Sequence, residues 1–393
     1  MKLENVMLGI VAAVSLMGQA GPGRGAAIKS PEVSADGKVT FRLRAPDAKE
    51  AFVTGVGQRL AMQKNEQGVW TATTDALKPD IYTYSFAVDG ATINDPANPA
   101  AKTSYGNAGQ SMVVVPGGMP WDPADGPRGS VTHVFYKSAI IGDNRDYYVY
   151  TPPNYDPSRR EAYPVLFLLH GLGDDAASWL NVGAANSILD NLIDQGKAKP
   201  MIMVNTLGYG TANGTTGAMS ANMIPTFSKA LIEEVLPQVE KAYHVSKDRN
   251  QHAIAGLSMG GAESLFAGLN FPDHFAYIGS FSGAFVMWPR AAAPAPQGQA
   301  GGGRGRGAQS METADFEKNF PNVGAKTGSQ LKLLWIACGT DDGLNNVNRE
   351  FKAWLKSKDV PFTDIEVPGY AHVWPLWRRN LETLAPMLFQ SGK

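Results

Sequence analysis

The stretch Gly256-Leu257-Ser258-Met259-Gly260 decides the fold of this chain. It follows the apolar run His252-Ala253-Ile254-Ala255 and opens a helix-like stretch from Met259 to Leu269. A G-x-S-x-G string between a strand and a helix is typical of a sharp turn that raises a serine hydroxyl above the edge of a sheet. Glycine is expected on both sides, because a side chain two places before or after the serine would collide with the neighbouring helix or strand. The pattern therefore predicts that Ser258 is a nucleophile.

A serine hydroxyl needs a base to accept its proton and a third group to orient that base. His372 is the candidate base, because it ends the glycine-containing loop that begins at Pro368, just before the last helix. The acid is expected directly after the strand Leu331 to Cys338, where Asp341 and Asp342 compete. Periodicity does not choose between these two aspartates. The chain order serine, acid, histidine is typical of an α/β-hydrolase.

Two backbone N–H groups are needed to stabilise the negative charge that develops in acyl transfer. Met259 is predicted to supply one at the start of its helix, where the helix dipole also helps. Leu172, in the string His170-Gly171-Leu172-Gly173 after the buried strand Val165 to Leu169, is predicted to supply the other. His170 is expected to shape this loop. The single cysteine, Cys338, is expected to be a buried core thiol, and the sequence contains no H-E-x-x-H, C-x-x-C or P-loop string. We therefore predict neither a metal nor another cofactor.

The composition and charge of the chain limit the kinds of partner that it can bind. The chain has 393 residues, 44% of them hydrophobic, and its formal net charge is −1 (Lys+Arg 35, Asp+Glu 36). Such a charge offers no global basic field for nucleic acid or for an anionic membrane. Lys2, the apolar run Val6 to Met17 and the small-x-small string Gly18-Gln19-Ala20 predict a secretory signal peptide that is too short to span a bilayer. We expect a secreted or periplasmic protein without stable membrane insertion.

The pattern of apolar and polar residues changes along the chain. After a signal peptide and spacer (1–27), residues 28–115 show short alternating runs separated by Asp-Gly and Gln-Gly turns, which predicts a small immunoglobulin-like β-sandwich. Residues 116–130 form a Pro/Gly linker. Residues 131–393 alternate apolar runs with helical patterns, which predicts a doubly wound, mostly parallel sheet with a flexible low-complexity insert at 289–309. Buried strands are predicted at Tyr163 to Leu169, Pro200 to Thr206, His252 to Leu257, Ala276 to Phe281 and Leu331 to Cys338. Helices are predicted at Ser228 to Tyr243, Asn346 to Lys356 and Leu376 to Leu388.

Four strings together resemble carbohydrate esterase family 1, the esterase D-like branch of α/β-hydrolases that contains feruloyl and acetylxylan esterases. They are Leu168-Leu169-His170-Gly171-Leu172-Gly173, Gly256-Leu257-Ser258-Met259-Gly260-Gly261, Cys338-Gly339-Thr340-Asp341-Asp342 and His372-Val373-Trp374-Pro375-Leu376-Trp377-Arg378. The resemblance covers roughly residues 131–390. Members of this family carry the acid at the fourth position of a G-T-x-D string, which here selects Asp342. The resemblance implies a serine carboxylic-ester hydrolase that acts through an acyl-enzyme.

The N-terminal segment resembles carbohydrate-binding module family 48 at Gly68-Val69-Trp70, Tyr82-Thr83-Tyr84 and Asp95-Pro96-Ala97-Asn98-Pro99. This resemblance implies glycan contact, with Trp70 placed either on a binding surface or in the core. Because every candidate catalytic residue follows Val131, we expect this segment to be dispensable for chemistry on small esters.

Two tryptophans lie just beyond the candidate base. Trp374 and Trp377 are either substrate-binding residues, whose indoles stack on a flat ring or a sugar face, or packing residues of the last helix. With the family resemblance and the predicted export, they favour release of ferulate or related hydroxycinnamates from a plant cell-wall polysaccharide such as arabinoxylan. The alternatives are an acetylxylan esterase and an enterochelin-type siderophore esterase.

Overall fold

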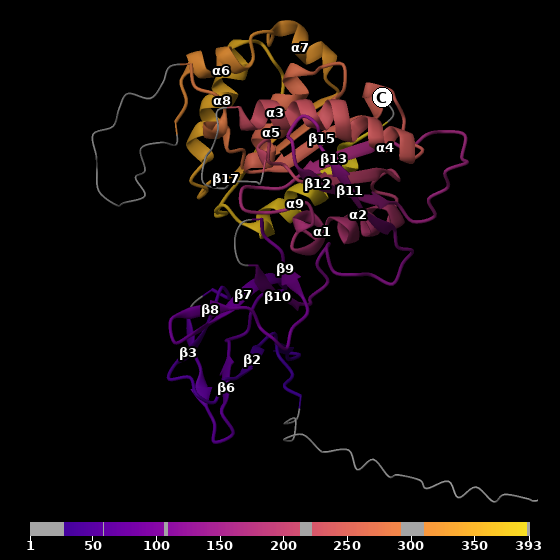
Figure 1. Ribbon diagram of the computed structural model, residues 1–393. Coiled ribbons are helices and arrows are strands. Elements are labelled where there is room, and N and C mark those ends of the chain that lie inside the picture. Colours follow the sequence, from indigo (N-terminus) through magenta and orange to yellow (C-terminus); the bar gives the residue numbers. More distant parts are fainter. Residues whose placement is uncertain (1–26, 58, 106–108, 213–221, 292–309, 391–393) are drawn as a thin grey trace, which may run out of the picture.

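The computed structural model describes residues 27–57, 59–105, 109–212, 222–291 and 310–390. Residues 32–115 form two antiparallel sheets, which we call the β-domain, and the chain from residue 130 onward forms one larger sheet with helices, which we call the α/β-domain (Figure 1). The predicted signal peptide and residues 292–309 of the predicted insert lie outside the described residues.

In the β-domain, alternating sequences produce strands with one buried and one open face. Along β2, for example, Val39, Phe41 and Leu43 are buried while the residues between them are not. One sheet has the order β1-β2-β6-β5, the other β4-β3-β7-β10-β9 with β8 paired to β7, and a single apolar core draws on both. The strands are β1 (Glu32–Val33), β2 (Val39–Arg44), β3 (Ala51–Thr54), β4 (Leu60–Ala61), β5 (Gln63–Lys64), β6 (Val69–Thr73), β7 (Asp80–Val88), β8 (Ala91–Ile93), β9 (Ala101–Lys102) and β10 (Gln110–Val115).

The α/β-domain is built on an eight-stranded sheet of order β11-β12-β14-β13-β15-β16-β17-β18. The pairs β11–β12 and β12–β14 are antiparallel, and all the others are parallel. The sheet is therefore mixed, with a largely parallel centre. Its strands are β11 (Ser130–Lys137), β12 (Asn144–Thr151), β13 (Val165–Leu169), β14 (Ile202–Thr206), β15 (His252–Leu257), β16 (Tyr277–Phe281), β17 (Leu333–Gly339) and β18 (Thr363–Val367).

Both faces of this sheet are covered, as the continuous apolar runs predict. In β13, Val165, Phe167 and Leu169 pack into one core, with α3 to α6 and α8, while Leu166 and Leu168 pack into the other, with α1, α2 and α9. The α-helices are α1 (Ser178–Asn181), α2 (Ala185–Asp194), α3 (Met223–Ala230), α4 (Leu236–Ala242), α5 (Met259–Asn270), α6 (Thr313–Asn319), α7 (Ala325–Gln330), α8 (Asn345–Ser357) and α9 (Trp374–Leu384).

Two parts of the α/β-domain differ from the prediction. The helix expected at 228–243 begins at Met223 and contains a π-helical turn, Leu231–Val235, just before Pro237. Proline has no N–H to donate to the preceding turn, so the helix widens there. The hairpin β11–β12 was not predicted, because β11 is largely exposed and lacks a one-sided apolar pattern.

The two domains are joined by buried polar contacts between side chains. The Arg378 side chain on α9 is fully buried; it donates to the Val182 carbonyl oxygen over 2.6 Å and pairs with Asp80 of β7. The predicted linker is itself packed: Trp121 is 2% exposed and lies under the Arg378 guanidinium, 5.0 Å from ring centroid to Cζ. The β-domain is thus held against α9 and the α1–α2 region. In the described part of the chain, none of the helices has the length and apolar character needed to cross a bilayer.

Candidate active site

The sharp strand-to-helix turn predicted at Ser258 is present. Ser258 lies between β15 and α5 with φ 53° and ψ −115°, a region that costs a non-glycine residue about 1–3 kcal/mol. Its N–H donates to the Phe281 carbonyl over 2.8 Å, and its carbonyl accepts from the Ala284 N–H over 2.8 Å. A Cβ on Gly256 would lie 2.5 Å from the Gly260 backbone, and a Cβ on Gly260 would lie 2.5 Å from the Leu169 oxygen. Both glycines are therefore required by the close approach of helix and strand.

The structure brings His372 and Asp342 together. His372 Nδ1 and Asp342 Oδ2 lie 2.8 Å apart, so Nδ1–H donates to the carboxylate. Asp342 lies three residues after the end of β17. Its side chain is fully buried, whereas that of His372 is 36% exposed. This pairing leaves His372 Nε2 free of Asp342 and available as a proton acceptor.

The ionised form of Asp342 is stabilised by its surroundings. Burial alone would raise its pKa, but the hydrogen bond and charge of His372, the Leu344 N–H and the Ser282 hydroxyl together lower the pKa below its ordinary value. The Leu344 N–H donates to Oδ1 over 2.8 Å. The carboxylate therefore stays charged beside His372, which suits it to stabilise a protonated imidazole.

Asp341 is placed differently. It is exposed, and its Oδ1 accepts a hydrogen bond from the neighbouring Thr340 hydroxyl over 2.9 Å. Its own N–H donates to the Tyr370 carbonyl. The geometry thus favours Asp342 as the partner of His372, in agreement with the family pattern.

The loop predicted to form the oxyanion hole lies against Ser258. A Cβ on Gly171 would lie 3.3 Å from Ser258 Cβ. His170 is buried, with Nδ1 2.8 Å from the Gly171 oxygen and Nε2 accepting from the Gly208 N–H over 2.9 Å. Burial lowers its pKa, which keeps the ring neutral. With both nitrogens engaged, His170 supports the loop and is not placed to act as a base.

A tyrosine that the sequence did not point to braces this loop. The Tyr209 hydroxyl accepts from the Gly173 N–H over 2.7 Å and donates to the Asp174 carbonyl over 3.0 Å. Ser282 was also missed. It follows β16 at the same sheet edge as Ser258, and that placement after a parallel strand could have drawn attention to it.

Ser258 and His372 line one cavity of about 500 Å³. Leu172, whose N–H is a predicted oxyanion donor, also lines it and is 44% exposed. Met259, the other predicted donor, is buried at the first position of α5. The further lining residues from the α/β-domain are Gly171, Asp174, Val182, Leu257, Val373, Trp374, Pro375 and Trp377.

The two tryptophans beyond His372 have different surroundings. Trp377 is 5% exposed; its Nε1 donates to the Ser282 hydroxyl over 3.2 Å, and its ring meets His372 edge-on at 4.9 Å. Trp374 is half-buried and packs edge-on against both Trp179 and Trp377. Trp377 therefore supports the His372 loop from within the core, while Trp374 presents its indole to the cavity.

The β-domain forms the other wall of this cavity, which was not expected. Its contributing residues are Gly55, Gly57, Ile81, Tyr82, Thr83, Lys102 and Gln110. Lys102 Nζ lies 2.5 Å from Asp174 Oδ1, and the two side chains are only 14% and 9% exposed. The expectation that this domain is dispensable for chemistry on small esters is therefore not supported by the placement of the cavity.

We predict that Lys102→Met lowers kcat/KM on a small soluble ester by about tenfold or more. The substitution leaves the Asp174 carboxylate buried without its partner, beside the Gly171–Gly173 loop. Removing one member of a buried ion pair typically destabilises the folded protein by about 3–5 kcal/mol. Steady-state kinetics and a thermal melt should be compared with Lys49→Met, which changes an exposed lysine of the same domain. Equal kinetics for the two variants would show that the ion pair does not support the site.

The described residues show no cluster of three or more His, Cys, Asp or Glu side chains that could hold a metal ion. Cys338 is buried in β17, and this burial raises the pKa of its thiol to about 12. A thiol in that state is a poor nucleophile.

Comparison with known proteins adds to this geometry. A family model described as "Putative esterase" matches residues 138–386. An endo-1,4-beta-xylanase/feruloyl esterase of Xylanibacter ruminicola is 31% identical over 375 residues, covering 92% of this chain and 46% of that protein. The chain thus spans about half the length of this curated relative.

Solved structures share the fold. A ferulic acid esterase is 25% identical with a TM-score of 0.53, covering 66% of this chain and 97% of its own. The enterobactin esterase of Shigella flexneri is 20% identical with a TM-score of 0.61, covering 89% and 92%. The similarity to the enterobactin esterase shows the fold alone. It extends over more of this chain than the similarity to the ferulic acid esterase does.

Proposed function

Because the chain belongs to the esterase family, we propose that it is a serine carboxylic-ester hydrolase that releases ferulate or related hydroxycinnamates from plant cell-wall polysaccharide. The observation that carries this proposal is the cavity in which Ser258, the Asp342-paired His372 and the Trp374 indole meet. The relative from Xylanibacter ruminicola, named in part as a feruloyl esterase, supports the choice of acyl group.

The proposed reaction runs through an acyl-enzyme. His372 Nε2 accepts the Ser258 hydroxyl proton while Oγ attacks the ester carbonyl carbon. When the carbon–oxygen bond to the alcohol breaks, Nε2–H gives that proton to the departing oxygen. Water then attacks the acyl carbon while His372 Nε2 accepts a proton from it. The bond between this carbon and Ser258 Oγ breaks, Nε2–H returns the proton to Oγ, and the carboxylic acid leaves. Asp342 orients Nδ1–H and stabilises the imidazolium formed in each half-reaction.

We propose that the N–H groups of Leu172 and Met259 receive the negative oxygen of both tetrahedral intermediates. Met259 begins α5, so its N–H points out of the helix N-terminus. The Gly171–Gly173 loop is held in place by His170, Tyr209 and, through Asp174, Lys102. Each donor is expected to contribute about 3 kcal/mol to stabilising the transition state.

Trp374 is the proposed contact for the aromatic acyl group. Its half-buried indole faces a cavity whose lining also includes the apolar side chains of Val182 and Leu257. A hydroxycinnamoyl ring is flat and can stack on an indole or meet it edge-on. Trp377 contributes indirectly, because it fixes the His372 loop.

An enterochelin-type siderophore esterase is the second candidate, because the Shigella flexneri enterobactin esterase matches across most of this chain. The charges around the cavity favour the first candidate. Among the described lining residues, Lys102 is the only lysine or arginine, and it is paired with Asp174. A neutral hydroxycinnamoyl ester suits this lining better than an anionic ferric catecholate complex.

The test is a substrate panel. We predict that kcat/KM is about 30- to 150-fold higher for methyl ferulate than for methyl acetate, because burying the aromatic ring contributes about 2–3 kcal/mol. Acetylated xylan and a catecholate siderophore complete the panel, with the Ser258→Ala protein as blank. Trp374→Leu should reduce the advantage of ferulate while leaving methyl acetate nearly unchanged. Faster cleavage of acetylated xylan or of the siderophore, with ferulate barely touched, would assign the chain to that alternative.

We further propose that the protein is exported and that the β-domain, a carbohydrate-binding-module-like sandwich, meets substrate at the shared cavity. Trp70 is not available for glycan, since it is 6% exposed and its Nε1 donates to the Ala45 carbonyl over 2.9 Å. Among the β-domain residues that line the cavity, Tyr82, Thr83, Lys102 and Gln110 carry polar side chains. Amino-terminal sequencing of the protein from the culture medium or periplasm would test export.

A further inference from the structure

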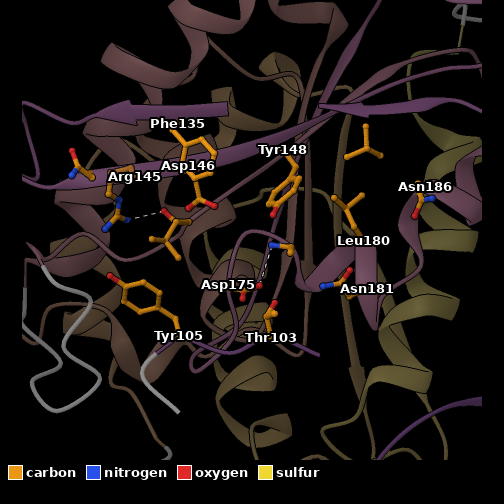
Figure 2. A pocket seen from close by; sticks show the side chains of 14 residues that line it. Thr103, Tyr105, Phe135, Arg145, Asp146, Tyr148, Asp175, Leu180, Asn181 and Asn186 are labelled. Carbon is orange, nitrogen blue, oxygen red and sulfur yellow. Dashed lines mark hydrogen bonds between the residues drawn. The ribbon is translucent and has the colours of Figure 1, made fainter. Parts of the chain in front are cut away.

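A second hollow, of about 770 Å³, lies beside the active-site cavity and is absent from the mechanism above. We call it the groove. Its principal lining side chains are Tyr105, Phe135, Tyr148, Asp175, Asn181 and Asn186. Figure 2 shows Phe135 and Tyr148 on the strand side of the groove, facing Tyr105, Thr103 and Asp175 on the other. Its volume falls within the ~300–1,000 Å³ that ligand pockets usually span.

An exposed aromatic platform forms the strand side. Phe135 on β11 is 74% exposed, although large apolar side chains are normally covered. His133 lies on the same face, 4.1 Å from Phe135 between ring centroids, and stacks on Tyr148 of β12 at 3.9 Å and 12°. His133 Nε2 lies 2.7 Å from Asp146 Oδ2, which fixes the imidazole. The rings are thus held in place by cross-strand pairing, and Phe135 offers a preformed apolar face.

Polar groups, two amides and one carboxylate, face this platform. The side-chain amides of Asn181 on α1 and Asn186 on α2 form no hydrogen bond within the part of the chain that the structure describes. Asp175 uses Oδ1 to accept from the Ala177 N–H and the Ser178 hydroxyl. Amides and carboxylates bind hydroxyl groups as acceptors and, for amides, as donors. A pyranose ring suits both sides, since it has an apolar C–H face and a rim of hydroxyls.

The charges exclude an anionic ligand. Among the described residues that line the groove, Arg145 is the only lysine or arginine; it is 2% exposed and donates to the Leu207 and Tyr209 carbonyls. Asp146 and Asp175 are the other charged lining groups. A neutral glycan therefore fits, whereas a polyuronate would meet carboxylates without an available cation.

The groove adjoins the active-site cavity. Consecutive residues line the two hollows at three places: Lys102 and Thr103, Asp174 and Asp175, and Val182 and Asn181. Tyr105 of the groove also stacks on Tyr209 at 5.2 Å, and Tyr209 holds the Gly173 N–H. A polymer whose ester side group enters the cavity would therefore have its backbone within reach of the groove.

We propose that the groove binds the neutral polysaccharide backbone that carries the ester cleaved at Ser258. This inference rests on the proposed function for the identity of the polymer. The groove is a positioning site that raises the affinity for polymeric substrate, and it takes no part in the chemistry of small esters.

The experiment compares Phe135→Ala and Asn186→Ala with Ile93→Ala, an exposed apolar residue of the β-domain, all in the full-length chain. Phe135→Ala is expected to lower kcat/KM on feruloylated arabinoxylan by about tenfold or more. An aromatic anchor can supply much of the binding free energy, and truncation to alanine removes that contribution. Asn186→Ala should cause a smaller loss. Methyl ferulate should be hydrolysed at the parent rate by all three variants.

A binding measurement tests the groove independently of whether the active enzyme releases ferulate. Xylohexaose is titrated calorimetrically into the Ser258→Ala protein with and without Phe135→Ala, and polygalacturonate serves as the anionic comparison. Weaker xylohexaose binding with Phe135→Ala, and little binding of polygalacturonate, would support the groove even if the active enzyme released no ferulate. Unchanged xylohexaose binding would overturn the proposal. So would a change of oligomeric state on size-exclusion chromatography with no change in glycan binding, because the platform would then be a contact between copies at the edge strand β11.

Discussion

Ser258→Ala is expected to lower kcat on methyl ferulate by about 10⁶-fold, the largest effect of any single change in this protein. Without Oγ no acyl-enzyme forms, and the oxyanion donors and His372 act only on a poorly placed water. The rate is measured in steady state, with ferulate release followed by absorbance. In parallel, a fluorophosphonate is reacted with the parent protein and the labelled peptide is identified by mass spectrometry.

Ser264→Ala is the matched control. Ser264 lies on the same helix, α5, and its buried hydroxyl donates to the Gly260 carbonyl over 2.6 Å. It should keep a kcat near that of the parent and should still be labelled at Ser258. Label on a serine other than Ser258, or a Ser258→Ala protein that retains most of its activity, would show that the nucleophile lies elsewhere.

Asp342→Asn is expected to lower kcat by about 10⁴-fold with little change in the fold. The asparagine amide would present N–H groups to His372 Nδ1 and favour the tautomer that carries its proton on Nε2. That nitrogen could then no longer accept the Ser258 proton. The loss should appear in kcat for every ester tested, because it concerns the base and not the substrate pocket.

Asp341→Asn is the neighbouring control, since Asp341 is exposed and accepts from Thr340. Its kcat should stay within a few-fold of the parent value. A loss at Asp341→Asn as large as that at Asp342→Asn would contradict the pairing of His372 with Asp342. A thermal melt of both variants separates a catalytic loss from partial unfolding.

Local sequence was sufficient for the features that depend on neighbouring residues. The elbow at Ser258 follows from two glycines whose absent side chains allow helix and strand to approach, and the structure confirms both contacts. The strands β13 and β15 were predicted because an apolar run buried on both faces needs no knowledge of its partners. Family likeness pointed to Asp342 over Asp341, a choice that periodicity left open.

The features that the sequence did not reveal depend on which distant segments meet. Nothing near Ser282 or Tyr209 in the chain indicates that one supports Asp342 and the other the Gly171–Gly173 loop. In the hairpin β11–β12, strand β11 is largely exposed and bears Phe135, so this strand has no one-sided apolar pattern. Its aromatic platform becomes recognisable only once the cross-strand pairs are known.

The sequence by itself determined the α/β class, the elbow and the candidate base, because each rests on steric or periodic rules that act over a few residues. Only the tertiary structure showed that the β-domain walls the active-site cavity and that Lys102 is paired with Asp174. That placement depends on buried contacts between residues about 300 positions apart, such as Asp80 and Arg378. Contacts of that separation leave no local pattern, because either side chain alone reads as an ordinary surface charge.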